Sequence, residues 1–66
     1  MPKTIDQLMD DKGHLVEFIY PCARGYILVR WFEQAITMHF LRQQLLPRDK
    51  ADWVKNGLIK YGYHYT

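Results

Sequence analysis

The chain has 66 residues, of which 48% are apolar and 15% aromatic, and its formal net charge is +2. This length allows one domain near the lower limit for folding alone, so residues 1–66 are predicted to form a single domain. Cys22 is the only cysteine, which excludes a disulfide within one chain. His14, His39 and His64 lack the spacing of metal ligands, so neither a metal nor another cofactor is expected. A small domain without these supports favours a homo-oligomer, most simply a dimer.

The sequence does not predict contact with a membrane. The first residues lead directly into an acidic segment and not into the apolar core of a secretory signal. Every charge-free run is much shorter than a membrane span. A single unpaired cysteine suits a reducing compartment. The sequence therefore predicts a cytoplasmic protein with no membrane partner.

The first predicted element is a helix of about two turns that begins at Thr4. Thr4 and Gln7 have the spacing of a capping box, in which a hydroxyl at the N-cap is followed three residues later by Glu or Gln. Ile5 and Leu8 supply an apolar edge at helical spacing, and Gly13 is a plausible end. So short a helix must dock on other elements to be stable.

Two strands are predicted next, at residues 14–20 and 26–32. Both runs are rich in β-branched and aromatic residues, and a five-residue connection bracketed by Pro21 and Gly25 is of hairpin length. Glu17 lies opposite the neighbourhood of Arg30, which predicts a cross-strand ion pair. Each strand is apolar on one face and half apolar on the other, so this sheet needs cover on both faces.

Two further helices and a last strand complete the prediction. Residues 33–46 contain strong helix formers and end at Pro47, with Ile36 and Phe40 on the side away from the main apolar stripe. A second helix is expected from an N-cap at Asp49 to Gly57, with Trp53 and Val54 buried. The tail, residues 58–65, alternates as a strand does. One face of that strand would carry Ile59, Tyr61, Tyr63 and Tyr65.

These elements predict an α+β fold: a three-stranded antiparallel sheet packed with short helices, in the order α-β-β-α-α-β. The alternative is a mostly α fold in which residues 25–46 form one long central helix, because residues 26–32 are also continuously apolar. The β-branched and aromatic enrichment favours the strand.

No group of residues in the sequence indicates catalysis. Cys22 lies near Arg24, which could lower the pKa of a thiol, but no base or oxyanion site accompanies it. The carboxylates of Asp49 and Asp52 are explained by capping of a helix. A chain of this length also has little core to spare for a pocket. The protein is predicted not to be an enzyme.

The predicted function is that of a non-enzymatic protein-interaction module, a regulator or inhibitor that binds a partner protein through aromatic surface. The residues predicted to bind the partner are Ile36, Phe40, Arg42, Arg48, Tyr61, Tyr63 and Tyr65. The alternative is a small nucleic-acid-binding regulatory protein that uses a basic, tyrosine-rich C-terminal third, because aromatic rings flanked by cations bind single strands. Its predicted residues are Arg42, Arg48, Lys50, Lys55, Lys60, Tyr61, Tyr63 and His64. The sequence pI of about 8.8 is lower than is usual for such a domain.

Overall fold

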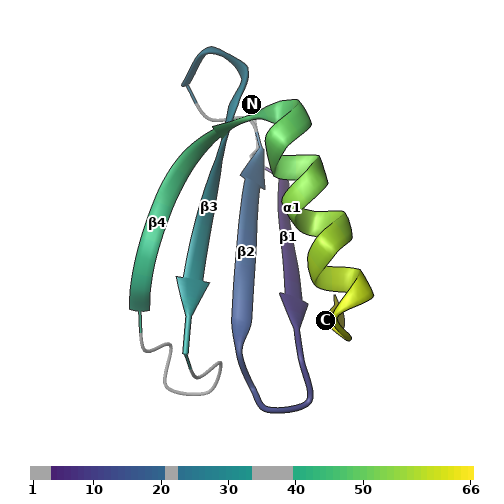
Figure 1. Cartoon of the computed structure of the whole chain (residues 1–66). Helices are drawn as coiled ribbons and strands as arrows, with labels where there is room; N and C mark the ends of the chain where they lie inside the picture. The colour runs from purple at the N-terminus through teal and green to yellow at the C-terminus, as the bar shows by residue number, and fades with distance from the viewer. Residues whose placement is uncertain (1–3, 21–22, 34–39) are drawn as a thin grey trace.

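Four consecutive strands form most of one antiparallel sheet, and a helix crosses one of its faces (Figure 1). The computed structural model describes residues 4–20, 23–33 and 40–66. The sheet contains β1 (Thr4–Met9), β2 (Leu15–Tyr20), β3 (Tyr26–Phe32), β4 (Phe40–Pro47) and the short β5 (His64–Tyr65), in the order β4-β3-β2-β1-β5. A 3-10 turn, η1 (Ala23–Gly25), precedes β3, and α1 (Arg48–Lys60) follows β4.

The central hairpin of β2 and β3 confirms the sequence prediction. The two strands pair antiparallel with Glu17 opposite Arg30, and their side chains form the predicted ion pair at 3.8 Å between Glu17 Oε1 and Arg30 Nη1. The turn before β3 places Arg24 at φ 56° and Gly25 at φ 79°, both in the left-handed region that glycine adopts most easily. Cys22 lies outside the described residues.

The predicted helix at the start of the chain is wrong, because Thr4–Met9 forms strand β1. All six residues of β1 pair with β2, so the ladder satisfies the backbone groups that a two-turn helix would leave unpaired at its ends. Asp10 then closes the β1–β2 connection. Its carboxylate accepts hydrogen bonds from the backbone N–H groups of Lys12 and His14, at 3.0 and 2.9 Å.

The predicted helix at residues 33–46 is also wrong, since Phe40–Pro47 forms strand β4 beside β3. Residues 34–39, including Ile36, lie outside the described residues. The helix formers of this segment are outweighed by pairing with the β3 edge, which places Leu46 against Ile27 on the face that α1 covers. The three-stranded sheet with several short helices does not form, and neither does the mostly α alternative.

The helix α1 is longer than predicted and begins and ends at different residues. Pro47 occupies the N-cap position and Asp49 lies in the first turn, where its charge favours the helix N-terminus. Gly57 lies inside the helix. The end is a Schellman motif at Gly62, φ 103°, in which the Gly62 N–H donates to the Ile59 carbonyl at 3.1 Å and the Tyr63 N–H to the Leu58 carbonyl at 3.0 Å. The predicted strand at residues 58–65 is therefore reduced to His64–Tyr65, which pairs with β1.

The core lies between α1 and the sheet. Alternate residues of β1, β2 and β3 point toward the helix, and Phe18 and Val29 at the centre are fully buried. The helix contributes Ala51, also fully buried, with Val54 and Leu58 packed beside it. Within the described ranges no helix is long and apolar enough to cross a membrane.

Candidate functional site

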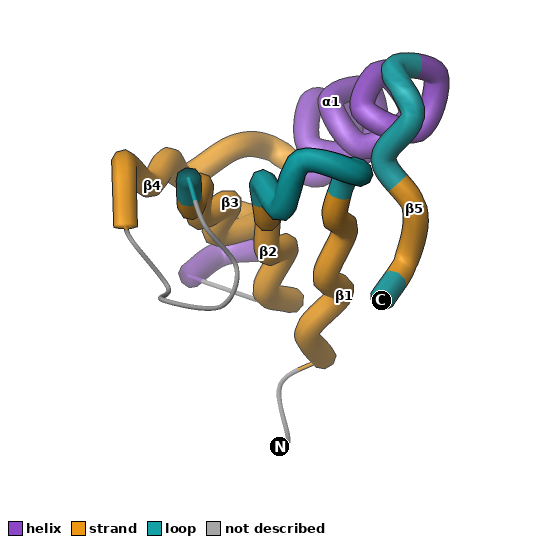
Figure 2. Tube along the Cα trace, turned by 90° about the horizontal axis from the view of Figure 1, so that it is seen from below, coloured by secondary structure: helices purple, strands orange, loops and turns teal. Residues whose placement is uncertain are grey.

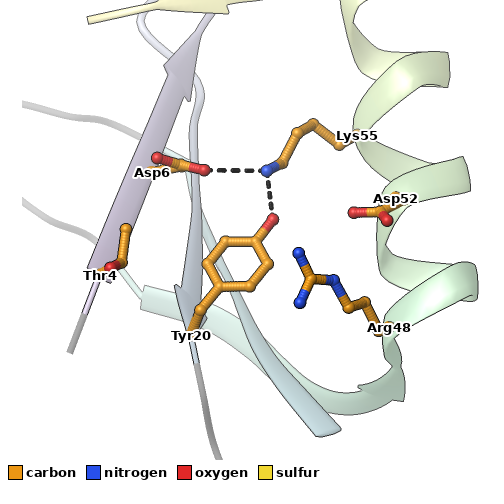
Figure 3. Close-up of a pocket in the computed structure, with 6 residues that line it drawn as sticks. All are labelled: Thr4, Asp6, Tyr20, Arg48, Asp52 and Lys55. Atoms are coloured by element: carbon orange, nitrogen blue, oxygen red, sulfur yellow. Dashed lines mark hydrogen bonds and ion pairs between the residues drawn. The ribbon is translucent and has the colours of Figure 1, made fainter. Parts of the chain in front are cut away.

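Three surfaces of the described structure are candidate sites. The first is a pocket of about 360 Å³ between the sheet and the first half of α1 (Figure 3). Its centre is the Lys55 ammonium group, which donates to Asp6 Oδ2 at 2.9 Å and to the hydroxyl oxygen of Tyr20. The aliphatic stem of Lys55 brings its charge over the rings of Phe18 and Tyr20, at 5.0 and 4.5 Å from the centroids.

The charges of this pocket are already balanced by its own residues. Burial lowers the pKa of Lys55, but the hydrogen bonds and charges of Tyr20 and Asp6 outweigh burial and raise it above its ordinary value. Arg48 and Asp52 point from α1 into the same space, so the lining has two cations and two carboxylates (Figure 3). The arrangement fixes α1 to β1 and β2, which is a structural task.

The second surface is the sheet face opposite α1, which three rows of side chains cross from strand to strand. The register aligns an aliphatic row, a polar row and a row of larger apolar side chains. They contain, in turn, Ile5, Ile19, Leu28 and Leu45; Gln7, Glu17, Arg30 and Gln43; and Met9, Leu15, Phe32 and Phe40.

Within the polar row, the buried Glu17 carboxylate is held from both sides. Gln7 Nε2 donates to Glu17 Oε2 at 2.7 Å, and Arg30 approaches the other carboxylate oxygen. The guanidinium of Arg30 also lies 5.3 and 5.6 Å from the ring centroids of Phe32 and Phe40, which contact each other edge to face. Arg30 Nε is buried without a hydrogen-bond partner among the described residues. Gln7, Glu17 and Arg30 of the polar row therefore bind one another.

The third surface is a groove of about 500 Å³ on the second half of α1. Trp53, Gly57 and Tyr61 follow one another at four-residue spacing along one side of the helix, so the glycine forms a floor between two aromatic walls. Trp53 is 73% exposed and Tyr61 is 88% exposed. The lining is completed by Val54, Asn56, Leu58 and Lys60. Of the described residues that line the groove, Lys60 is the one with a charge.

The described members of the predicted partner-binding set lie on different parts of the structure, and Ile36 lies outside the described residues. Tyr61 lies at the groove, Arg48 at the Lys55 pocket and Phe40 on the opposite sheet face. Arg42 stacks on Trp31 at 4.9 Å, and Tyr63 is half-buried beside the core. The exposed Tyr65 lies on β5.

The predicted nucleic-acid residues are also distributed among different surfaces. Lys55 forms an ion pair with Asp6, and Lys60 lines the groove. Lys50 is exposed on α1 and His64 is exposed on β5. No group of three or more histidine, cysteine or acidic side chains in the described ranges is placed to hold a metal ion.

Sequence reasoning missed the groove because it treated Trp53 as buried and Gly57 as the end of the helix. The signal was present in the spacing: Trp53, Gly57 and Tyr61 share a helix face only if the helix continues past the glycine. Comparisons with protein-family models, curated proteins and solved structures found no match. A function for this protein can therefore be inferred only from the geometry of these surfaces.

Proposed function

We propose that the protein is a non-enzymatic protein-interaction module and that the groove between Trp53 and Tyr61 on α1 binds its partner. The observation that carries this proposal is the exposure of two large aromatic side chains on either side of a helical glycine. Tryptophan and tyrosine are the residues most enriched at the energetic centres of protein interfaces. Trp53 is held on α1 and Tyr61 at its C-cap, where the Tyr61 N–H donates to the Gly57 carbonyl at 3.1 Å, so both rings are presented without the ordering cost of a flexible loop.

Gly57 supports the proposal because the fold itself does not require a glycine there. Its backbone is helical, and apart from its chain neighbours and the backbone of its own helix, no atom of the described residues would lie within 4 Å of a Cβ atom at this position. A glycine inside a helix costs roughly 0.8–1.0 kcal/mol relative to alanine. No contact in the described part of the chain offsets this cost, whereas a glycine between the two rings lets a partner's side chain approach the helix backbone.

The lining indicates the chemistry of the partner. The groove offers two aromatic rings and the apolar side chains of Val54 and Leu58, with Lys60 as its one charged group. An apolar side chain of the partner would fill the space over Gly57, and a neighbouring carboxylate would pair with Lys60. Binding there would act by occupying a surface of the partner, as a regulator or inhibitor does, without any chemical step.

The test uses a variant that improves the helix while filling the groove. Gly57→Ala is expected to raise the free energy of unfolding by about 0.5–1 kcal/mol and to weaken partner binding by about tenfold or more. Trp53→Ala should weaken binding similarly without unfolding the protein, because its side chain is mostly exposed. Ile59→Ala is the matched control, since Ile59 is an exposed apolar residue of α1 outside the groove lining.

Binding is measured by quantitative capture of proteins from lysate on immobilised wild-type and variant protein, with and without nuclease treatment. The proposal expects one or more proteins retained by the wild type and by Ile59→Ala, and lost with Gly57→Ala and Trp53→Ala. Equal retention by Gly57→Ala contradicts it. Material released by nuclease alone would instead favour the nucleic-acid alternative, whose binding should weaken steeply as salt is raised.

A further inference from the structure

The two edges of the sheet are built differently, and only one of them is short. At one edge the two residues of β5 pair with Leu8 and Met9, and the Thr66 N–H donates to the Gln7 carbonyl at 3.0 Å, so among the described residues only Thr4–Asp6 of β1 keep an unpaired outer side. The opposite edge is β4, eight residues long, and no further strand pairs with its outer side in the described structure. An edge strand directs alternate backbone N–H and C=O groups away from its sheet, and proteins commonly avoid unwanted pairing by keeping such strands very short. The β5 edge follows this rule and the β4 edge does not.

The composition of β4 also lacks the usual protection against pairing. It has one charged residue, Arg42, whose guanidinium is drawn over the Trp31 ring, and it has no lysine. Leu41 and Leu45 are exposed, as are the two central glutamines. The irregular register at Phe40 and the proline at position 47 confine regular pairing to the five residues Arg42–Leu46. The centre of this regular stretch is Gln44.

We propose that β4 pairs antiparallel with β4 of a second copy of the chain, about a two-fold axis through Gln44 normal to the sheet. Two five-stranded sheets would then join into one continuous sheet with both helices on the same side. Gln44 would lie opposite Gln44 of the second copy, where two side-chain amides can hydrogen-bond across the axis. Gln43 would lie opposite Leu45, and Arg42 opposite Leu46.

The geometry of the chain favours β4 of a second copy over an unrelated strand at the β4 edge. An antiparallel match of β4 with itself places the two Arg42 charges four residues apart along the strands, roughly 13 Å, so like charges do not face each other. Figure 2 shows α1 over the β1–β5 side of the sheet, away from the outer side of β4, which leaves room for a second copy. A domain of this size also gains from a second subunit, because its own core is small. The groove on α1 is a different surface, so this inference does not depend on the proposed function.

The first measurement is the mass in solution, by sedimentation, of the wild type and of Gln44→Lys at high micromolar concentration. The wild type is expected to be a dimer. Gln44→Lys should be a folded monomer, because it places two like charges on the axis at an exposed position. Asn56→Lys, an exposed change on α1, is the matched control and should remain dimeric. A monomeric wild type, or a dimeric Gln44→Lys, overturns the proposal.

The second measurement tests the register with single cysteines in a Cys22→Ser background. Residues directly opposite in an antiparallel pair have Cα atoms about 4.5–5.5 Å apart, which suits a disulfide. Gln44→Cys is therefore expected to cross-link to itself under mild oxidation at least about tenfold faster than Gln43→Cys or Asn56→Cys. Equal rates at positions 44 and 56 would reflect random collision, and faster cross-linking at position 43 would place the axis elsewhere. Either result overturns the proposed dimer.

Discussion

Among the described residues an ion pair lies on each face of the sheet, and the two pairs are built in opposite ways. On the face under α1 the cation is the more buried partner, with the Lys55 side chain 12% exposed and that of Asp6 33% exposed. On the opposite face the anion is more buried, with Glu17 9% exposed and Arg30 38% exposed. Both buried charges have a second hydrogen-bond partner, Tyr20 for Lys55 and Gln7 for Glu17.

The difference between the pairs lies in what each one joins. Lys55 and Asp6 connect α1 to β1, 49 residues away in the chain, so this pair helps to fix the helix on the sheet. Glu17 and Arg30 connect adjacent strands that backbone pairing already holds together. We infer that the first pair contributes to docking of the helix. The second sets which side chains face each other in the sheet, since a one-residue slip would separate them.

The largest effect is expected from replacing Glu17, the buried partner of the ion pair on the sheet face opposite α1. Glu17→Leu leaves Gln7 without its acceptor and Arg30 without its counter-charge, next to an Nε that already lacks a partner among the described residues. We expect a loss of about 2 kcal/mol in the free energy of unfolding, below the range for fully buried pairs because Arg30 retains contact with water. Urea unfolding followed by circular dichroism, at one fixed protein concentration, measures this loss.

The double variant Glu17→Leu, Arg30→Leu sharpens the interpretation. Replacing both partners by apolar side chains should bring the free energy of unfolding to within about 1 kcal/mol of the wild type, because no charge is left unpaired. A double variant as unstable as the sum of its single changes would show that Glu17 and Arg30 do not interact energetically, contrary to the role assigned here.

The pair under the helix should give a smaller loss. Lys55→Met keeps most of the stem that packs over Phe18 and Tyr20 and leaves Asp6, which is a third exposed and can be hydrated. We expect a loss of about 1–2 kcal/mol at neutral pH. Because the folded-state pKa of Lys55 is raised, its contribution is present below the unfolded pKa and is lost as pH rises through the folded pKa.

A pH series above about pH 10 therefore tests the Lys55 assignment. Stability of the wild type should fall there more steeply than stability of Lys55→Met. Part of the fall should persist in the variant, because burial and the charge of Asp10 raise the pKa of Tyr63, and Tyr63 favours its neutral form in the folded protein. Identical alkaline profiles for the two proteins would show that Lys55 does not contribute to the loss of stability at high pH.

The sequence predicted the central hairpin and its Glu17–Arg30 pair because alternation and β-branched enrichment act locally in β2 and β3. It failed for β1 and β4, whose residues also suit a helix, because pairing with the neighbouring strands β2 and β3 outweighed their local preference. The groove on α1 was missed for a related reason. A glycine is a common helix end, and only the Schellman hydrogen bonds at Gly62 show that the helix passes Gly57.

The smallest expected effect concerns Asp10, which closes the β1–β2 connection away from both ion pairs. Burial raises the pKa of Asp10, but hydrogen bonds from the side chain and backbone of His14 and from the backbone of Lys12 outweigh burial, so the pKa lies below its ordinary value. A lowered folded-state pKa gives stability that is present above the unfolded pKa and is lost as pH falls through the folded pKa. The loss should therefore occur below about pH 4.

Asp10→Asn separates the charge of this turn from its hydrogen bonds. The amide oxygen can still accept from the backbone N–H groups of Lys12 and His14, so the loss at neutral pH should stay below about 1 kcal/mol. The charge-assisted contact of Asp10 Oδ2 with His14 Nδ1, 2.8 Å in the wild type, is lost. Between about pH 5 and pH 2 the variant should lose less stability than the wild type, while Asp11→Asn, at the exposed neighbouring position, should follow the wild type. If Asp10→Asn has the same acid profile as the wild type, the carboxylate acts in this turn only as a hydrogen-bond acceptor, and its charge adds nothing to the stability of the fold.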